Sequence, residues 1–151
     1  MKFNLLGTGG SIPIPRIGCE CSVCVNARNF GKPYKRNCSS LFLTEINTLF
    51  DCPEDINSSI NENGILEIDH LFITHWHPDH TFGIRLLMEH CFNFYENKVT
   101  KQFFIYLPQK VYDTLKKVYP SIEYQLSLKT SILKIISDRD YIFQQCHSAL
   151  R

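Results

Sequence analysis

Residues 71–80, Leu-Phe-Ile-Thr-His-Trp-His-Pro-Asp-His, place three histidines and one aspartate within six positions of each other. The first three residues of this stretch are apolar and predict a short buried strand. After the histidine stretch, from residue 81 to residue 95, apolar residues recur at helical spacing. We therefore expect the polar cluster on a loop between a strand and a helix, where several side chains can converge.

The spacing within this loop indicates metal binding. His75 and His77 are two residues apart, so they share one face of an extended segment. Neutral imidazole is the commonest metal ligand in proteins. Pro78 bends the chain, after which Asp79 and His80 can face a second ion. Such a mixed nitrogen and oxygen set suits zinc, manganese or iron. The alternative, a loop with fortuitous histidines, is less favoured.

A second group of potential ligands lies near the N-terminus. Cys19, Cys21 and Cys24 fall within six residues and could bind one tetrahedral zinc ion. A closed site needs four ligands, and Cys38 or His90 could supply the fourth. We expect a structural zinc knuckle inserted near residues 18–38, with three free thiols as the alternative.

The composition excludes several classes of protein. A length of 151 residues allows a single domain, 1–151, and no apolar run is long enough to span a bilayer. The net charge of +1 gives no global electrostatic case for nucleic acid or membrane binding. Seven cysteines without a signal sequence indicate a reducing, cytoplasmic compartment.

The rest of the chain alternates between strand and helix patterns. Helices are predicted over residues 54–60 and 108–119. The predicted strands cover residues 2–6, 40–44, 48–51, 103–107, 131–136 and 141–146. The glycines Gly7, Gly9 and Gly10 favour a structural turn over a phosphate-binding loop. The pattern predicts a mixed α/β fold.

The basic stretch of residues 26–37 allows two interpretations. A solvated loop is favoured for its four cations, Arg28, Lys32, Lys35 and Arg36. Contact with phosphate is the other reading, because arginine suits bidentate phosphate binding. His70 and His90 are expected to be structural.

The histidine loop resembles that of the metallo-β-lactamase superfamily. Together with residues 5–10 (Leu-Leu-Gly-Thr-Gly-Gly) and residues 18–24 (Gly-Cys-Glu-Cys-Ser-Val-Cys), the chain is similar to the phosphoribosyl 1,2-cyclic phosphate phosphodiesterases within it. The resemblance implies a layered αββα sandwich with a one- or two-metal hydrolytic centre. It covers about the first half of such a protein. The chain is therefore expected to be a fragment, or to be completed by another chain or by a homo-oligomer.

The same resemblance implies roles for individual residues. His147, at the end of the last predicted strand, would join His75 and His77 on the first metal. Asp79 and His80 would bind the second metal. Asp51 would accept a hydrogen bond that holds a ligand in place. A bridging aspartate and a histidine that completes the cysteine site are expected downstream of this chain.

The implied activity is metal-dependent hydrolysis of a small cyclic phosphodiester, with zinc or manganese as catalytic ions. Asp79 would orient the attacking water or accept its proton. A nuclease or another esterase is the alternative enzyme, although the near-neutral charge makes nucleic acid a less favoured partner. A non-catalytic metal-binding half-domain that needs a partner chain is the alternative from a different class.

Overall fold

The computed structural model describes residues 2–137 of the chain. The expected strand over residues 141–146 and the proposed metal ligand His147 lie outside the described residues. None of the helices in the described part is long and apolar enough to cross a membrane.

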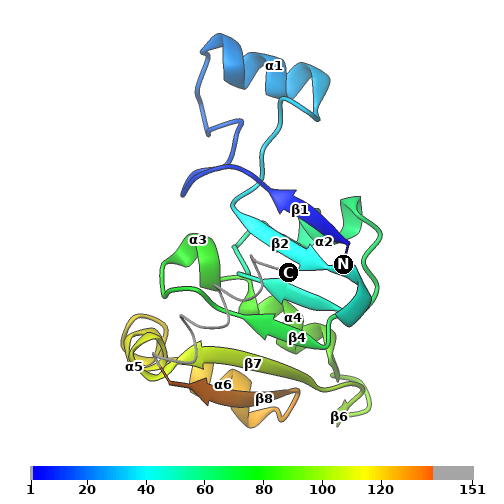
Figure 1. Ribbon diagram of the computed structural model, residues 1–151, viewed down its shortest axis with the longest axis vertical. Helices are drawn as coiled ribbons and strands as arrows, with labels where there is room; N and C mark the ends of the chain where they lie inside the picture. The colour runs from blue at the N-terminus through cyan, green and yellow to red at the C-terminus, as the bar shows by residue number, and fades with distance from the viewer. Residues whose placement is uncertain (1, 138–151) are drawn as a thin grey trace.

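Six strands form one mixed sheet in the order β1, β2, β3, β4, β7, β8 (Figure 1). Strands β1 to β3 pair antiparallel, and β3, β4, β7 and β8 run parallel. The bounds of the strands are Phe3–Gly7, Ser40–Leu43, Thr48–Phe50, His70–Phe72, Phe103–Pro108 and Ser131–Ile136. Each of the six strands predicted within the described residues is confirmed to within two residues at either end.

The core lies between the sheet and the helices α2 (Ile56–Glu62) and α4 (Ile84–His90). Figure 1 shows these two helices behind the sheet. Leu49, Leu71 and Ile105 are fully buried in neighbouring central strands. Ile56 and Ile84 cover them from the helices and are also fully buried. This burial explains the apolar runs that the sequence shows at these strands.

Aromatic side chains line the opposite face of the sheet. Phe50, Phe72 and Tyr106 are paired in register across β3, β4 and β7. The Phe50 and Phe72 ring centroids lie 5.2 Å apart, and those of Phe72 and Tyr106 lie 4.4 Å apart, with both pairs stacked. A sheet that carries its helical layer on one face and apolar side chains on the other matches one half of a layered sandwich.

The helix predicted over residues 81–95 is wrong in its second part. A short helix α3 (Pro78–Thr81) and α4 meet at Gly83, and α4 ends at His90. A hairpin of β5 (Phe92–Asn93) and β6 (Lys98–Val99) follows. Phe92 lies four residues after Met88, a spacing that imitates a helix, but its ring contacts that of Phe94 at the hairpin.

Three further helices complete the described chain. Helix α5 (Gln109–Val118) confirms the helix predicted over residues 108–119, whereas α6 (Ile122–Ser127) was not predicted. Helix α1 (Ser22–Phe30) also was not predicted, because a cysteine-rich loop and a basic loop were expected there. It belongs to an arm, residues 10–36, that projects away from the sheet at the top of Figure 1.

The predicted helix over residues 54–60 is α2, shifted by two residues. A 3-10 turn, Thr44–Ile46, joins β2 to β3.

Candidate functional site

The histidine loop begins where β4 ends, beside the end of β3. Ligand sites of open α/β sheets form at the carboxyl ends of parallel strands, and β3 and β4 run parallel. Asp51 directly follows β3, and its backbone N–H donates to the Phe72 carbonyl at 2.8 Å. Asp51 adopts a positive φ of 60°, which turns the chain away from the strand direction. Its carboxylate is thereby placed under the loop.

The Asp51 carboxylate binds both ends of the loop. Thr74 donates its backbone N–H to Oδ1 at 2.8 Å and its hydroxyl to Oδ2 at 2.8 Å. His80 Nδ1 lies 2.8 Å from the same Oδ2. Asp51 is only 6% exposed, so these contacts are sheltered from water. The sequence did not identify Thr74 as a partner, although its position directly behind a buried strand could have indicated one.

Helix α3 fixes the second half of the loop. His77 is its N-cap and Pro78 its first residue, a position where proline costs no hydrogen bond. The Thr81 hydroxyl donates to the His77 carbonyl at 2.9 Å. The Cys52 backbone N–H donates to the His80 carbonyl at 2.8 Å, which ties the helix to the segment behind Asp51.

The structure brings the predicted catalytic ligands together in two pairs. His75 Nε2 lies 3.2 Å from His77 Nδ1. His80 Nε2 lies 3.3 Å from Asp79 Oδ2. The two pairs are adjacent, since the ring centroids of His75 and His80 are 3.9 Å apart. Four of the five predicted ligands of the catalytic metals therefore share one loop, and the fifth is His147, outside the described residues.

The environment of His75 favours the form that binds metal. Burial, and next to it the nearby His80, lowers the pKa of His75 below its ordinary value. The imidazole therefore stays neutral at physiological pH and keeps a free nitrogen lone pair. The donor set of three imidazoles and one carboxylate suits zinc or manganese.

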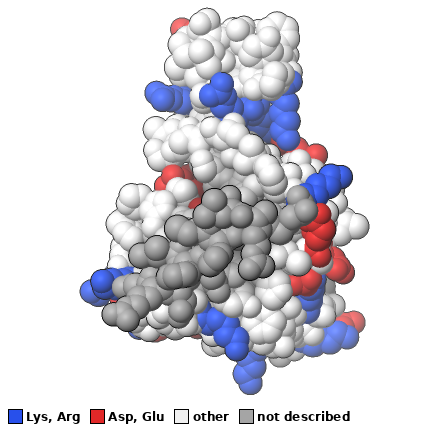
Figure 2. Space-filling view, viewed as in Figure 1, with Lys and Arg blue, Asp and Glu red and all other residues white. Residues whose placement is uncertain are grey.

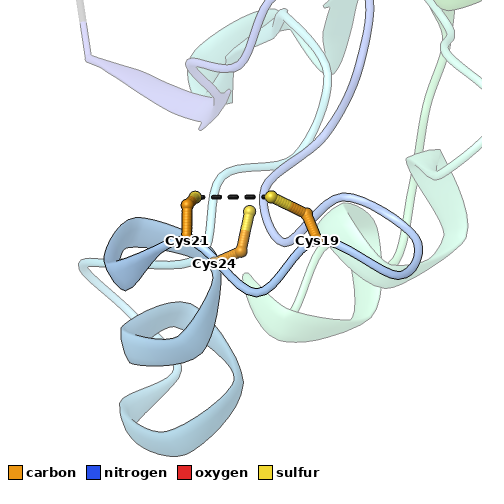
Figure 3. Close-up of side chains that lie close together, drawn as sticks. All are labelled: Cys19, Cys21 and Cys24. Atoms are coloured by element: carbon orange, nitrogen blue, oxygen red, sulfur yellow. Dashed lines mark hydrogen bonds between the residues drawn. The ribbon is translucent and has the colours of Figure 1, made fainter.

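The cysteine cluster is more tightly assembled than the histidine loop. The sulfurs of Cys19, Cys21 and Cys24 all lie within 4.8 Å of one another, the only such group of three or more potential ligands in residues 2–137. The Cys19 and Cys21 sulfurs are 3.4 Å apart (Figure 3). A tetrahedral zinc–thiolate site with bonds of about 2.3 Å separates its sulfurs by about 3.8 Å. The arrangement therefore fits a zinc ion.

Helix α1 organises these three thiols. Cys21 is the N-cap of α1, and Cys24 lies buried in its first turn. A hydrogen bond from the Cys24 backbone, followed by one from the Cys19 thiol, lowers the pKa of Cys21 to about 7. A thiolate is the form that binds zinc, so this shift favours metal binding near neutral pH.

Neither alternative fourth ligand belongs to this group in the described structure. Cys38 is fully buried, and burial raises the pKa of its thiol to about 12. His90 lines a cavity of about 220 Å³ between α2 and α4. Both suggestions from the sequence are thus unsupported.

The glycine-rich turn serves packing. A Cβ on Gly7 would collide with the Cys38 carbonyl oxygen. A Cβ on Gly9 would come within 2.7 Å of the Asn37 carbonyl oxygen, to which the Gly9 N–H donates. These contacts agree with the structural reading of the turn.

Comparison with known proteins identifies similar chains. Residues 26–132 match the family model described as "Anti-Pycsar protein Apyc1". A ribonuclease Z from Picrophilus torridus is 28% identical over 144 residues, which cover 94% of this chain and 40% of that protein.

Solved structures share the fold. A diphosphatase from the PhnP family superposes with a TM-score of 0.68 at 25% identity, covering 89% of this chain and 49% of that one. Zinc-bound PqqB from Methylobacterium extorquens superposes with a TM-score of 0.73 at 18% identity, covering 91% of this chain and 46% of that one. The chain thus spans less than half the length of these relatives. The predicted fold class, the first half of a metallo-β-lactamase-like sandwich, is confirmed.

Proposed function

The chain belongs to the Anti-Pycsar protein Apyc1 family, in the metallo-β-lactamase superfamily, and from this premise we propose that it forms the catalytic-loop half of a metal-dependent phosphodiesterase. The observation that carries the proposal is the convergence of His75, His77, Asp79 and His80 on one loop. The proposed substrate is a small cyclic phosphodiester.

We assign His75, His77 and His147 to a first ion and Asp79 with His80 to a second. Zinc or manganese bound there would lower the pKa of water and neutralise charge on the phosphoryl oxygens. The neutral state of His75 keeps its nitrogen available for an ion. Asp51 holds His80 through Nδ1, so Nε2, which faces the Asp79 carboxylate, is the nitrogen left to bind an ion.

Asp79 is the proposed proton acceptor. Its carboxylate lies 3.3 Å from His80 Nε2 and is partly buried, so it can orient a water molecule and take its proton. His80 and Asp51 continue this arrangement as a chain of contacts that fixes the carboxylate's direction. The role is that of a general base.

The cysteine cluster has a structural role in this proposal. A zinc ion on Cys19, Cys21 and Cys24 would hold the start of α1 against residues 16–19. The Cys24 sulfur already accepts the Arg16 backbone N–H at 3.4 Å. Thiol labelling with and without a chelator tests this role: protection that disappears with the chelator supports zinc, and equal rates in both conditions contradict it. The six cysteines of residues 2–137 are free thiols, which fits the cytoplasmic location that we infer.

A nuclease is the second candidate within the same chemistry. The similarity to a ribonuclease Z favours it, and it shares the proposed metal loop. A half-domain that becomes active only with a partner chain is the candidate from another class, since the relatives are more than twice as long as the matched segment.

Metal content and substrate choice test the proposal together. The reference chain lacks the cysteine cluster through Cys19→Ser, Cys21→Ser and Cys24→Ser, so that elemental analysis reports on the histidine loop alone. Adding His75→Ala and His77→Ala should remove the remaining zinc or manganese, whereas adding His90→Ala should leave it bound. Unchanged metal content in the first variant would contradict the proposal. Parallel assays with ribose 1,2-cyclic phosphate derivatives, bis-aryl phosphodiesters and RNA separate the substrate classes.

A further inference from the structure

The arm carries a charge opposite to that of the rest of the chain. Residues 16–36 contain five cations, Arg16, Arg28, Lys32, Lys35 and Arg36, and one acidic residue, Glu20, for a net charge of +4. Since the whole chain has a net charge of +1, the remaining residues sum to −3. Three thiolates with one zinc ion would add −1 and leave the arm near +3. Figure 2 shows the blue side chains as a belt just below the projecting end of the molecule.

Two of these cations have neither an ion-pair partner nor a side-chain hydrogen bond in the described structure. Lys32 and Lys35 both contact Glu62, at 3.1 and 2.7 Å, and Arg28 donates to the Cys19 carbonyl. Arg16 and Arg36, by contrast, are exposed and make no side-chain hydrogen bond or ion pair within residues 2–137. Ile14, two residues before Arg16, exchanges backbone hydrogen bonds of 2.8 and 2.9 Å with Arg36 at the base of the arm.

The same segment exposes two aromatic rings. Gly31, with a φ of 64°, ends α1 and turns the chain, and the Lys35 N–H closes the turn on the Gly31 carbonyl at 2.8 Å. The turn brings Phe30 and Tyr34 together, with ring centroids 5.7 Å apart and planes tilted by 49°. Phe30 is 65% exposed and Tyr34 48% exposed. The core therefore does not account for either ring.

We propose that residues 28–36, with Arg16, form a docking surface for single-stranded nucleic acid. Exposed aromatic rings between unpaired cations are the combination that such ligands require: the cations neutralise phosphates, and the rings stack on bases without sequence preference. Arg16 and Arg36 contact backbone phosphates, and Phe30 and Tyr34 stack on successive bases. This inference goes beyond the proposed hydrolysis, because RNA binding by the arm does not require turnover at the histidine loop and is measured without it.

Fluorescence anisotropy with a labelled single-stranded RNA of about 12 nucleotides tests the surface on the zinc-loaded 151-residue chain between about 50 and 200 mM salt. Each lost phosphate contact lowers the slope of log K against log salt by about 0.7. The double variant Arg16→Glu, Arg36→Glu should therefore lower the slope by about 1.4. The double variant Phe30→Ala, Tyr34→Ala should weaken binding by about 5- to 150-fold per ring and leave the slope unchanged.

Matched controls lie elsewhere on the surface. Lys117→Glu with Lys129→Glu makes the same charge change at two exposed positions, one in α5 and one shortly after α6. Figure 1 shows these two helices at the opposite end of the molecule from α1. Tyr95→Ala with Tyr124→Ala removes two rings that are 103% and 62% exposed. Both control pairs should bind RNA like the original chain.

The folding of the arm is verified by circular dichroism and by the zinc-to-protein ratio. If an alanine or glutamate variant loses zinc, two conservative double variants replace it in the test: Arg16→Lys with Arg36→Lys, and Phe30→Trp with Tyr34→Trp. Both double variants should retain RNA binding. Three results would overturn the inference: no binding of RNA at low salt, equal competition by polyglutamate together with no effect of removing the rings, or binding to anionic vesicles in place of RNA.

Discussion

The Asp51 carboxylate lies 2.8 Å from His80 Nδ1 and, through the same oxygen, 2.8 Å from the Thr74 hydroxyl. One buried side chain thus connects the first and last parts of the histidine loop. The segments that meet here are more than twenty residues apart in sequence, so their alignment depends on this contact and on the strand pairing beneath it.

Replacing Asp51 by asparagine should destabilise the loop and the protein. An amide keeps one acceptor oxygen, but it turns an N–H₂ group towards Thr74 or His80 and leaves one of these partly buried partners unsatisfied. We expect a loss of about 1–3 kcal/mol in the free energy of unfolding and about 10- to 100-fold weaker metal binding. Urea denaturation and metal titration measure the two effects. Asp113→Asn in α5, where the side chain is about half exposed, is the control, and equal behaviour of the two variants would contradict the role of Asp51.

Gly83 offers a second test, through packing rather than charge. A Cβ at this position would collide with the Pro53 carbonyl oxygen and lie 2.6 Å from Ile56 Cγ2. Gly83→Ala should therefore push α4 away from α2 and cost about 1–3 kcal/mol. Gly10→Ala is a matched control, because a Cβ there has nothing within 4 Å. Thermal unfolding compares the two, and a Gly83→Ala chain as stable as the Gly10→Ala chain would contradict the packing described here.

These contacts show which parts of the fold the sequence could predict. The strands at residues 71–73 and 103–107 were recognisable because buried parallel strands leave uninterrupted apolar runs. The close approach of Gly83 to the segment after Asp51 left no such pattern, so a continuous helix was predicted across it. Contacts between distant segments leave no local signal in the sequence.

The arm shows the same limit in a different way. Helix α1 is short, and only Cys24 and Ala27 of its nine residues are buried. Its apolar face is therefore too narrow to produce a helical pattern, and its polar and basic residues predicted a loop. The cysteine cluster, in contrast, was recognisable from the sequence. Cys19, Cys21 and Cys24 fall within six residues, so a short segment is enough to bring their sulfurs together.

Glu62 links the arm to α2 and makes this link sensitive to pH. Hydrogen bonds and ion pairs with Lys35, and then with Lys32, lower the pKa of Glu62. A carboxyl with a lowered pKa in the folded state stabilises the protein above its unfolded pKa, and this contribution is lost as the pH falls through the folded value. The contacts are partly exposed, so we expect less than about 1 kcal/mol, reduced further by salt.

Urea denaturation of the Glu62→Gln chain against the original chain measures this contribution. The difference in unfolding free energy should be present at pH 7 and vanish in acid, below the lowered pKa. Glu54→Gln makes the same change at an exposed residue and is the control. A Glu62→Gln difference that persists in acid would show that the ionised carboxylate is not its source.

The last prediction concerns the activity of the 151-residue chain by itself. The described loop brings its ligands together as two pairs, and no three of these donor atoms lie mutually within 4.8 Å in residues 2–137. An ion held by so few groups binds weakly, and clamping of the attacking and leaving oxygens by two ions is then lost. Such a loss costs several kcal/mol of transition-state stabilisation, about a thousandfold or more in rate.

We therefore expect the monomeric chain, with zinc or manganese added, to hydrolyse cyclic phosphodiesters slowly. Its kcat/KM should lie at least about a thousandfold below the lower range for enzymes, which is about 10⁴ M⁻¹ s⁻¹. An assembly that contains the second half of the sandwich should recover the rate, and Asp79→Asn in that assembly should abolish it. Size-exclusion chromatography coupled to the assay assigns activity to monomer or assembly, and turnover at the full rate in the monomer fraction would show that the two pairs of ligands suffice.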